Sequence, residues 1–161
     1  MDIFLPTRSL KICALVACLG AHAVVMAADT GSAPSRPTAA ARMEQARDAI
    51  KVQNWKTALS ELKLAVRDEP RNADVHNLLG YSYRKQPQPD LPQAFVHYKR
   101  ALELNPSHKG AHEYIGEAYL MDKKPEEAEK HLAKLEQLCG NKTCEEYEDL
   151  AKALTDYRAK K

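Results

Sequence analysis

The sequence predicts an all-α protein, an α-solenoid of three helix pairs followed by a C-terminal capping helix. From residue 39 onward, apolar residues recur three and four positions apart, and no stretch alternates with the period of two expected of a β-strand. Small and aromatic residues also recur at intervals of 34 to 36 residues, the length of a two-helix repeat. One more amphipathic stretch, residues 143–158, follows the repeats.

Length and charge exclude several other classes of protein. The chain has 161 residues, which suits one domain of ordinary size. Its 24 Lys and Arg against 22 Asp and Glu give a net charge of +2, which offers no electrostatic case for nucleic-acid binding. Apolar residues make up 44% but aromatic residues only 6%, so we expect a core built mainly from Ala and Leu.

The first 28 residues have the features of a secretory signal peptide. Arg8 and Lys11 precede an apolar run over residues 12–28, which ends in the small residues Ala27 and Ala28. A basic start, a short apolar middle and a small-residue end are typical of an exported chain, and the run is short for a permanent membrane span. We therefore expect a bacterial, periplasmic protein; the alternative is a retained N-terminal anchor.

A second interpretation concerns Cys18. Residues 15–18, Leu-Val-Ala-Cys, resemble the lipobox of bacterial lipoproteins, in which the cysteine is acylated after cleavage. The apolar run before Cys18 is short and continues after it, unlike the usual lipoprotein pattern. A lipid-anchored protein therefore stays the alternative to cleavage near Ala28. Residues 29–38, polar and broken by Pro34 and Pro37, read as a flexible linker.

The repeat is clearest at two glycines, Gly80 and Gly116, which lie 36 residues apart within helical patterns. A mid-helix glycine costs about 1 kcal/mol relative to alanine, so two at equivalent positions indicate close approach of another helix. The turn at residues 86–92 is two residues longer than its counterparts, which explains the 36-residue spacing. Other matches at this period are Tyr83 with Tyr119; Ala58, Ala94 and Ala128; Ala65 with Ala101; and Pro70 with Pro106.

These residues resemble the tetratricopeptide repeat (TPR) family. The matching motifs are Leu79-Gly80-x-x-Tyr83, Ala94-x-x-x-Tyr98-x-x-Ala101-Leu102, Asn105-Pro106, Ile115-Gly116-x-x-Tyr119 and Ala128-x-x-x-Leu132. The resemblance implies three units, 39–72, 73–108 and 109–142, with 143–161 as the capping helix that repeat arrays need for solubility. The first unit departs from the pattern, with Ala46 and Ala49 in place of Gly and Tyr.

Several residues are expected to begin helices. Asn72 and Ser107 are suited to cap the first helices of the second and third units. Asp90 and Pro125 mark the start of second helices, and residues 143–146, Thr-Cys-Glu-Glu, match a capping box at the start of the final helix.

Cys139 and Cys144 are the two cysteines that remain once residues 1–28 are removed. An even pair in an oxidising compartment predicts a disulfide, here one that fastens the capping helix to the last repeat. Four residues separate the two, so they do not form the C-x-x-C of thiol oxidoreductases. A thiol-redox role for Cys139 and Cys144 is the alternative, since Cys144 lies in the first turn of its helix, where the dipole lowers a thiol pKa.

No other residues point to catalysis, and we expect neither an enzyme nor a cofactor. His108 and His112 are four residues apart but lack the glutamate of a zinc-protease motif, so we predict no metal site. His76 and His112 occupy equivalent repeat positions, which favours a packing role. The chain contains no G-x-S-x-G and no glycine-rich phosphate loop.

The TPR resemblance implies a concave groove, lined by the first helix of each pair, that binds a peptide or another protein. Tyr81 and Tyr114 are the most informative positions, because aromatic residues anchor interfaces; the alternative is that they pack against neighbouring helices. The Lys/Asn pattern of TPR domains that clamp a C-terminal carboxylate is absent, with Met43 and Gly110 at two of its places. The expected groove residues, at outward and exposed positions on these helices, are Arg47, Asn77, Tyr81, Arg84, Glu113, Tyr114 and Glu117, with Tyr147 as an addition from the capping helix.

The sequence therefore predicts a non-catalytic protein-interaction module or scaffold of the bacterial cell envelope. Its partner would be a protein or peptide of unknown identity. The alternatives are a lipid-anchored envelope assembly factor acylated at Cys18 and a thiol-redox protein using Cys139 and Cys144.

Overall fold

The computed structural model describes residues 36–160, which form seven α-helices and no β-strand. This confirms the predicted all-α fold. None of these helices is both long enough and apolar enough to cross a membrane. The proposed signal peptide, Cys18 and residues 29–35 of the linker lie outside the described residues. The helices are α1 (Ala39–Lys51), α2 (Trp55–Asp68), α3 (Ala73–Lys85), α4 (Leu91–Leu104), α5 (Lys109–Met121), α6 (Pro125–Cys139) and α7 (Glu145–Ala159).

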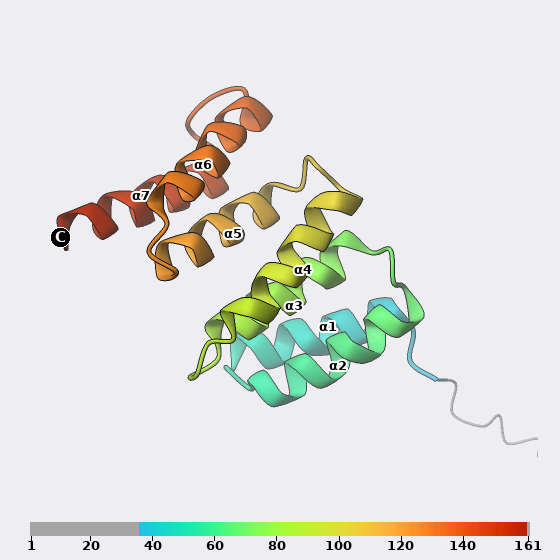
Figure 1. Cartoon of the computed structure of the whole chain (residues 1–161). Helices are drawn as coiled ribbons and strands as arrows, with labels where there is room; N and C mark the ends of the chain where they lie inside the picture. Colours follow the sequence, from blue (N-terminus) through green and yellow to red (C-terminus); the bar gives the residue numbers. More distant parts are fainter. Residues whose placement is uncertain (1–35, 161) are drawn as a thin grey trace, which may run out of the picture. The chain divides into compact units, whose positions relative to one another are not determined.

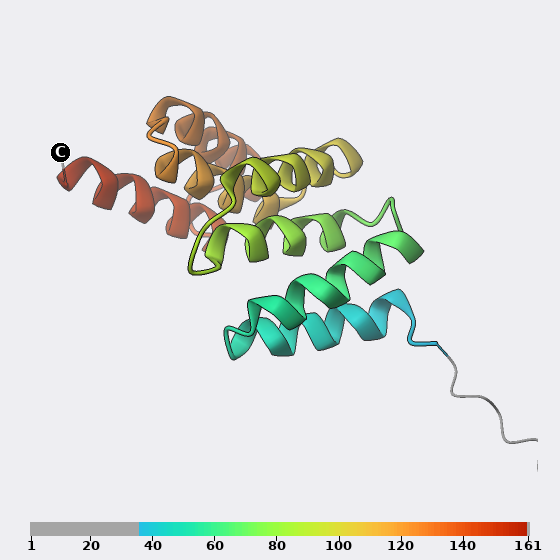
Figure 2. The same cartoon turned by 60° about the horizontal axis from the view of Figure 1, so that its bottom comes forward.

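The first six helices form three consecutive hairpins, α1 with α2, α3 with α4 and α5 with α6 (Figure 1). The turn between α3 and α4, residues 86–90, is two residues longer than those at 52–54 and 122–124, as the sequence predicts. Each second helix also packs against the following first helix, and Figure 2 shows this succession from another side. The first helices α1, α3 and α5 begin at Ala39, Ala73 and Lys109, the first residues of the three expected units.

Two of the expected helix caps are confirmed. The Asn72 side-chain oxygen accepts hydrogen bonds from the backbone N–H groups of Asp74 and Val75, at 3.0 and 3.2 Å. The Asp90 carboxylate accepts one from Gln93 at 3.1 Å. These bonds satisfy backbone donors that the first helical turn leaves unpaired.

The cap of α5 is His108 and not Ser107, so that expectation is wrong. His108 Nδ1 accepts a hydrogen bond from the backbone N–H of Ala111 at 3.2 Å. Ser107 belongs to the preceding turn, where its own backbone N–H donates to the Asn105 side chain at 3.0 Å. The turn therefore ends one residue later than expected.

The expected capping box at the start of α7 is also wrong. Cys144 is the N-cap residue of α7 and makes no side-chain capping bond. The Thr143 hydroxyl instead donates to the Asn141 side-chain oxygen at 3.0 Å, and the Thr143 backbone N–H bonds to the same oxygen. The Asn141 turn thus engages the hydroxyl that a capping box requires.

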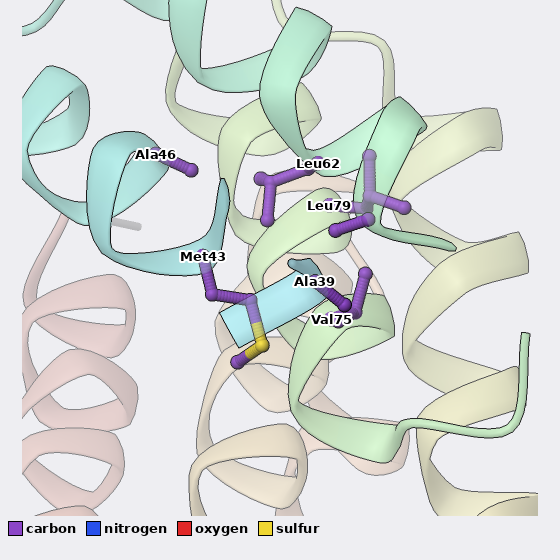
Figure 3. Packing of buried hydrophobic residues seen from close by; sticks show 7 residues of the cluster. Ala39, Met43, Ala46, Leu62, Val75 and Leu79 are labelled. Atoms are coloured by element: carbon purple, nitrogen blue, oxygen red, sulfur yellow. The ribbon is translucent and has the colours of Figure 1, made fainter. Parts of the chain in front are cut away.

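The core is a row of apolar clusters, each shared between successive helices. In the first cluster, Met43 of α1, Leu62 of α2 and Leu79 of α3 point toward one another, with Ala46 and Val75 beside them (Figure 3). Burial of such side chains contributes about 1.5–3 kcal/mol each for the larger ones. Because each cluster includes residues from the next pair, the packing holds neighbouring pairs together.

The two mid-helix glycines lie where another side chain approaches closely, as their repetition predicts. A Cβ atom at Gly80 would come 2.6 Å from the buried Tyr98 ring of α4. A Cβ atom at Gly116 would come 2.6 Å from Leu150 of α7. Both positions therefore require a residue without a side chain, and the second explains how α7 packs onto α5.

Candidate partner-binding groove

Two open hollows run along the side of the described domain that the first helices form. The hollow between α1, α3 and α5 has a volume of about 250 Å³, and a second of about 350 Å³ lies between α3, α5 and α7. The residues that line them come from these four helices and from Lys160, which directly follows α7; none comes from α2, α4 or α6. We refer to the two hollows together as the first-helix groove.

An aromatic and charged cluster separates the two hollows. The Tyr81 and Tyr114 rings lie 4.9 Å apart between centroids, and the Arg84 guanidinium lies 5.6 and 5.5 Å from them. Arg84 also forms an ion pair with Glu117 and donates from Nε to the Tyr98 hydroxyl at 3.2 Å. Arg84 is thus held by an acid, a hydroxyl and two aromatic faces.

Tyr81 and Tyr114 pack against neighbouring rings and also line the groove, so their role as interface anchors stays a prediction. Each is half-buried, because the rings pack against each other and Tyr114 also contacts Tyr98. Each also lines the 250 Å³ hollow, together with Arg47 of α1. Burial raises the pKa of Tyr114 to about 12, so its hydroxyl stays protonated and able to donate a hydrogen bond.

Three of the residues expected to point outward are instead buried. Asn77 and Glu113 are 7% exposed and Arg84 is 5% exposed. Asn77 faces the next first helix, because its amide nitrogen lies 3.5 Å from where a Cβ of Gly110 on α5 would be, an ordinary van der Waals contact. These side chains therefore lie mostly between helices, and only a small part of each is open to solvent.

Glu113 lies in surroundings that favour its neutral form. Burial, and then the negative charges of Glu117, Asp149 and Glu146, raise the pKa of Glu113 to about 8, although the positive charge of Arg84 opposes the shift. At neutral pH Glu113 is therefore mostly a carboxylic acid. It is not the exposed anion that the sequence led us to expect.

A third hollow, which the sequence did not lead us to expect, continues the groove at its α1 end. It has a volume of about 620 Å³ and shares Ile50, Lys51 and Tyr81 with the 250 Å³ hollow. Its other wall includes Trp55, the first residue of α2, and Lys85 at the end of α3. Trp55 is the single tryptophan of the chain, a signal in the sequence that could have marked it as a binding residue.

Tyr147, the residue expected to join the groove from the capping helix, lies elsewhere. It packs against the core between α5, α6 and α7.

Four of the five histidines in the repeats form two matching pairs, and none of the four lines the groove. His76 and His97 approach with their Nδ1 atoms 3.1 Å apart, and His112 and His131 do so at 2.9 Å. In each pair the first histidine is tied through Nε2 to the backbone oxygen of a turn proline, at 3.2 Å in one and 3.0 Å in the other. The expected packing role of His76 and His112 is confirmed.

Cys139 and Cys144 are joined by a disulfide between the end of α6 and the start of α7. Their sulfur atoms and a carboxylate oxygen of Glu146 lie within 4.8 Å of one another. Sulfurs bonded to each other are not the thiolates that metal ions bind, so the three residues do not make a metal site in this state.

Comparisons with known proteins agree with the repeat arrangement. The profile of the family described as "Tetratricopeptide repeat" matches residues 43–95 and 90–141. No curated protein matches the chain in sequence.

Solved structures with the same fold include TPR domains bound to chaperone peptides. The first TPR of Spaghetti (RPAP3) bound to the HSP90 peptide SRMEEVD has a TM-score of 0.65 and 19% identity, covering 76% of this chain and 94% of that one. The TPR2B domain of yeast Sti1, in a pHsp70 complex, has a TM-score of 0.68 and 13% identity, covering 76% and 98%. The first TPR domain of human RPAP3 has a TM-score of 0.61 and 19% identity, covering 77% and 98%. At these identities the likeness concerns the fold.

Proposed function

Because the chain belongs to the tetratricopeptide repeat family, whose fold is a protein-interaction scaffold, we propose that it is a non-catalytic binding module of the bacterial cell envelope. It would hold a peptide or protein partner in the first-helix groove. Its export would depend on the signal-like residues 1–28, and the partner would be another envelope protein.

The observation that carries this proposal is the composition of the groove. Tyr81 and Tyr114 present half-buried rings to a hollow that also contains exposed parts of Arg47 and Ile50. Arg and Tyr are among the residues that contribute most to interface binding energy. The groove is open, so a segment of a partner can lie along it without any change of the helices.

Co-purification from the native envelope tests the binding proposal. We expect Arg47→Ala combined with Tyr81→Ala to reduce capture of a specific partner at least about tenfold, since hot-spot side chains are each worth 1 kcal/mol or more. The matched control is Val96→Ala with Lys99→Ala on α4, a pair exposed on a second helix. The assignment to the groove would be refuted if both variants lost capture equally, or if neither variant lost it.

The location is tested by the intact mass of the mature protein from envelope fractions. Cleavage near Ala28 gives an unmodified chain in the periplasmic fraction. A diacylated or triacylated N-terminus at Cys18 in the membrane fraction would show the lipid-anchored alternative. A full-length chain in the membrane fraction would show a retained anchor.

The thiol-redox alternative is tested on the same material. We propose that the Cys139–Cys144 disulfide fastens α7 and has no exchange function. The native protein should then resist thiol labelling and show no exchange with a dithiol substrate. Rapid turnover of the disulfide by such a substrate would favour the redox role.

A further inference from the structure

The α1 end of the groove differs in charge from its α7 end. The two hollows that share Ile50, Lys51 and Tyr81 are lined by three cations, Arg47, Lys51 and Lys85, and their lining contains no carboxylate. The hollow at the α7 end, which Lys85 also lines, is mixed in charge, because Glu117 and Asp156 lie there beside its basic residues. With a net charge of only +2 for the whole chain, this basic lining is a local feature.

The three cations are able to meet an incoming carboxylate. Within residues 36–160, Arg47 and Lys51 form ion pairs only with Glu44 and Asp48 of their own helix, at 2.5 and 2.9 Å, in solvent-exposed contacts. Such exposed pairs contribute about 0–1 kcal/mol and exchange readily. Lys85 has no ion pair among the described residues.

Aromatic rings also line the same two hollows. The Trp55 and Tyr81 ring centroids lie 6.3 Å apart, and Tyr81 in turn lies 4.9 Å from Tyr114. Trp55 and Tyr81 are both half-buried, so each leaves part of its ring to the hollow. A large aliphatic or aromatic side chain seated here would bury apolar area against Ile50 and the rings.

Resting on the proposed function, we propose that the α1 end of the groove binds an internal acidic segment of a protein partner, with an aromatic or large aliphatic residue seated near Trp55 and Tyr81. Flanking Asp or Glu side chains meet Lys51, Lys85 and Arg47. A recessed, aromatic-lined hollow suits a peptide better than a membrane surface. The tilted Tyr pair, already packed together, offers no row of open rings for successive bases of a nucleic acid.

Trp55 supplies the readout, because it is the only tryptophan and lines the hollow itself. The probe is a peptide of sequence Asp-Glu-Phe-Glu-Asp, acetylated and amidated so that it has no terminal charge, titrated into the full mature chain. We expect a saturable change in Trp55 emission, with affinity at least about tenfold higher than for the Lys-Lys-Phe-Lys-Lys peptide and decreasing with added salt. A peptide with Gly in place of Phe should also bind at least about tenfold more weakly.

Two variants test the residues. Lys51→Glu with Lys85→Glu should lower the affinity for the acidic peptide at least about tenfold, since like charges then oppose it. The control, Lys99→Glu with Lys130→Glu, makes the same charge change on exposed positions of the second helices α4 and α6 and should change the affinity less than about twofold. Leaving the C-terminus of the peptide free should likewise change the affinity less than about twofold, because side-chain carboxylates are the groups recognised.

Several results would overturn the inference. It fails if the basic peptide binds equally well, if both charge-reversal variants behave alike, or if no peptide alters Trp55 emission. Tighter binding of an oligodeoxythymidine would instead identify a nucleic-acid site. If the peptides fail while Arg47→Ala with Tyr81→Ala still abolishes partner capture, the proposed function stands and only the acidic chemistry is refuted.

Discussion

Acidification should weaken this protein through its two histidine pairs. In each pair the first histidine faces a backbone oxygen, which only accepts, so its Nε2 carries the hydrogen and its Nδ1 is left to accept. The second histidine, His97 or His131, must then donate from Nδ1. A fully charged pair would set two N–H donors against each other and break the bond.

The structure gives the sign and size of the effect. Burial, then the neighbouring His76 and Lys63, lower the pKa of His97 from 6.5 to about 4. Burial, and then the neighbouring His112, lower the pKa of His131 to about 4 as well, although the negative charge of Glu127 opposes the shift. Below about pH 6.5 the unfolded chain therefore binds protons that the folded one does not, so stability is present above the unfolded pKa and is lost as the pH falls toward 4.

The magnitude is about 2 kcal/mol for both pairs between about pH 7.5 and about pH 5. Undiscounted, each depressed pKa would cost about 2 kcal/mol over that range, at 1.36 kcal/mol per pH unit. Partial exposure of both rings roughly halves this through solvent screening. His76 and His112, whose pKa values are also lowered by burial, add to the loss in the same direction.

Urea unfolding of His97→Asn with His131→Asn at both pH values measures the effect. Asparagine keeps a donor near the Nδ1 position but does not titrate. We expect acidification to be less destabilising for this variant than for the wild type by about 2 kcal/mol, whatever the overall stability of each. Parallel pH dependence of variant and wild type within about 0.5 kcal/mol would refute the reasoning.

Three further predictions concern other residues. Glu113 should make the wild type less stable as the pH rises, not as it falls. Because its pKa is raised to about 8, the folded state holds a proton that the unfolded chain lacks, and stability falls as the pH rises from about 4.5 to about 8. The variant Glu113→Gln should lack this loss. Between about pH 4.5 and about pH 7 the urea series of variant and wild type should differ by about 3 kcal/mol, and an unchanged profile would mean that Glu113 is ionised. Gly80→Ala should lower the free energy of unfolding by about 1–2 kcal/mol, because a Cβ atom 2.6 Å from a buried ring costs more than alanine gains in the helix. The control Gly110→Ala, whose Cβ would have nothing nearer than 3.5 Å, should be neutral or stabilising. Equal effects of the two substitutions would contradict close packing at Gly80. Replacing Cys139 and Cys144 by Ser should cost about 2 kcal/mol in urea unfolding, and no difference from the oxidised protein would show that the disulfide does not fasten α7.

The fold was predictable because its determinants are local and repeat. Helical periodicity, the longer turn at 86–90 and the caps at Asn72 and Asp90 each depend on a few neighbouring residues. Gly80 revealed a contact between helices because only close approach justifies a glycine there. Because these signals repeat, the positions of successive helix pairs along the chain could also be predicted.

The groove was only partly predictable, because exposure depends on how neighbouring first helices meet. Repeat position alone places Arg84 and Glu113 on the outward face, yet both are buried. Arg84 contacts Glu117 of α5 and Tyr98 of α4, and the charges of Asp149 and Glu146 on α7 act on Glu113. Trp55 was missed for the converse reason. It belongs to a second helix, and it reaches the groove only because α2 starts beside the end of α1. Competing local bonds, such as Asn141 with Thr143, are likewise hard to rank from sequence.

The capping helix has a second role that follows from its register. Leu150 lies 34 residues after Gly116, where a fourth repeat would have its glycine, and its side chain fills the space that Gly116 leaves. Helix α7 therefore packs closely on α5, more extensively than α5 packs on α3, and Ala153 and Asp156 line the groove. Its position is held at one end by the disulfide and along its length by this contact. Asp156 of α7 joins Glu117 of α5 in placing carboxylates at one end of the groove, whereas the lining at the α1 end has none. We therefore expect an acidic segment to favour the α1 end over the α7 end.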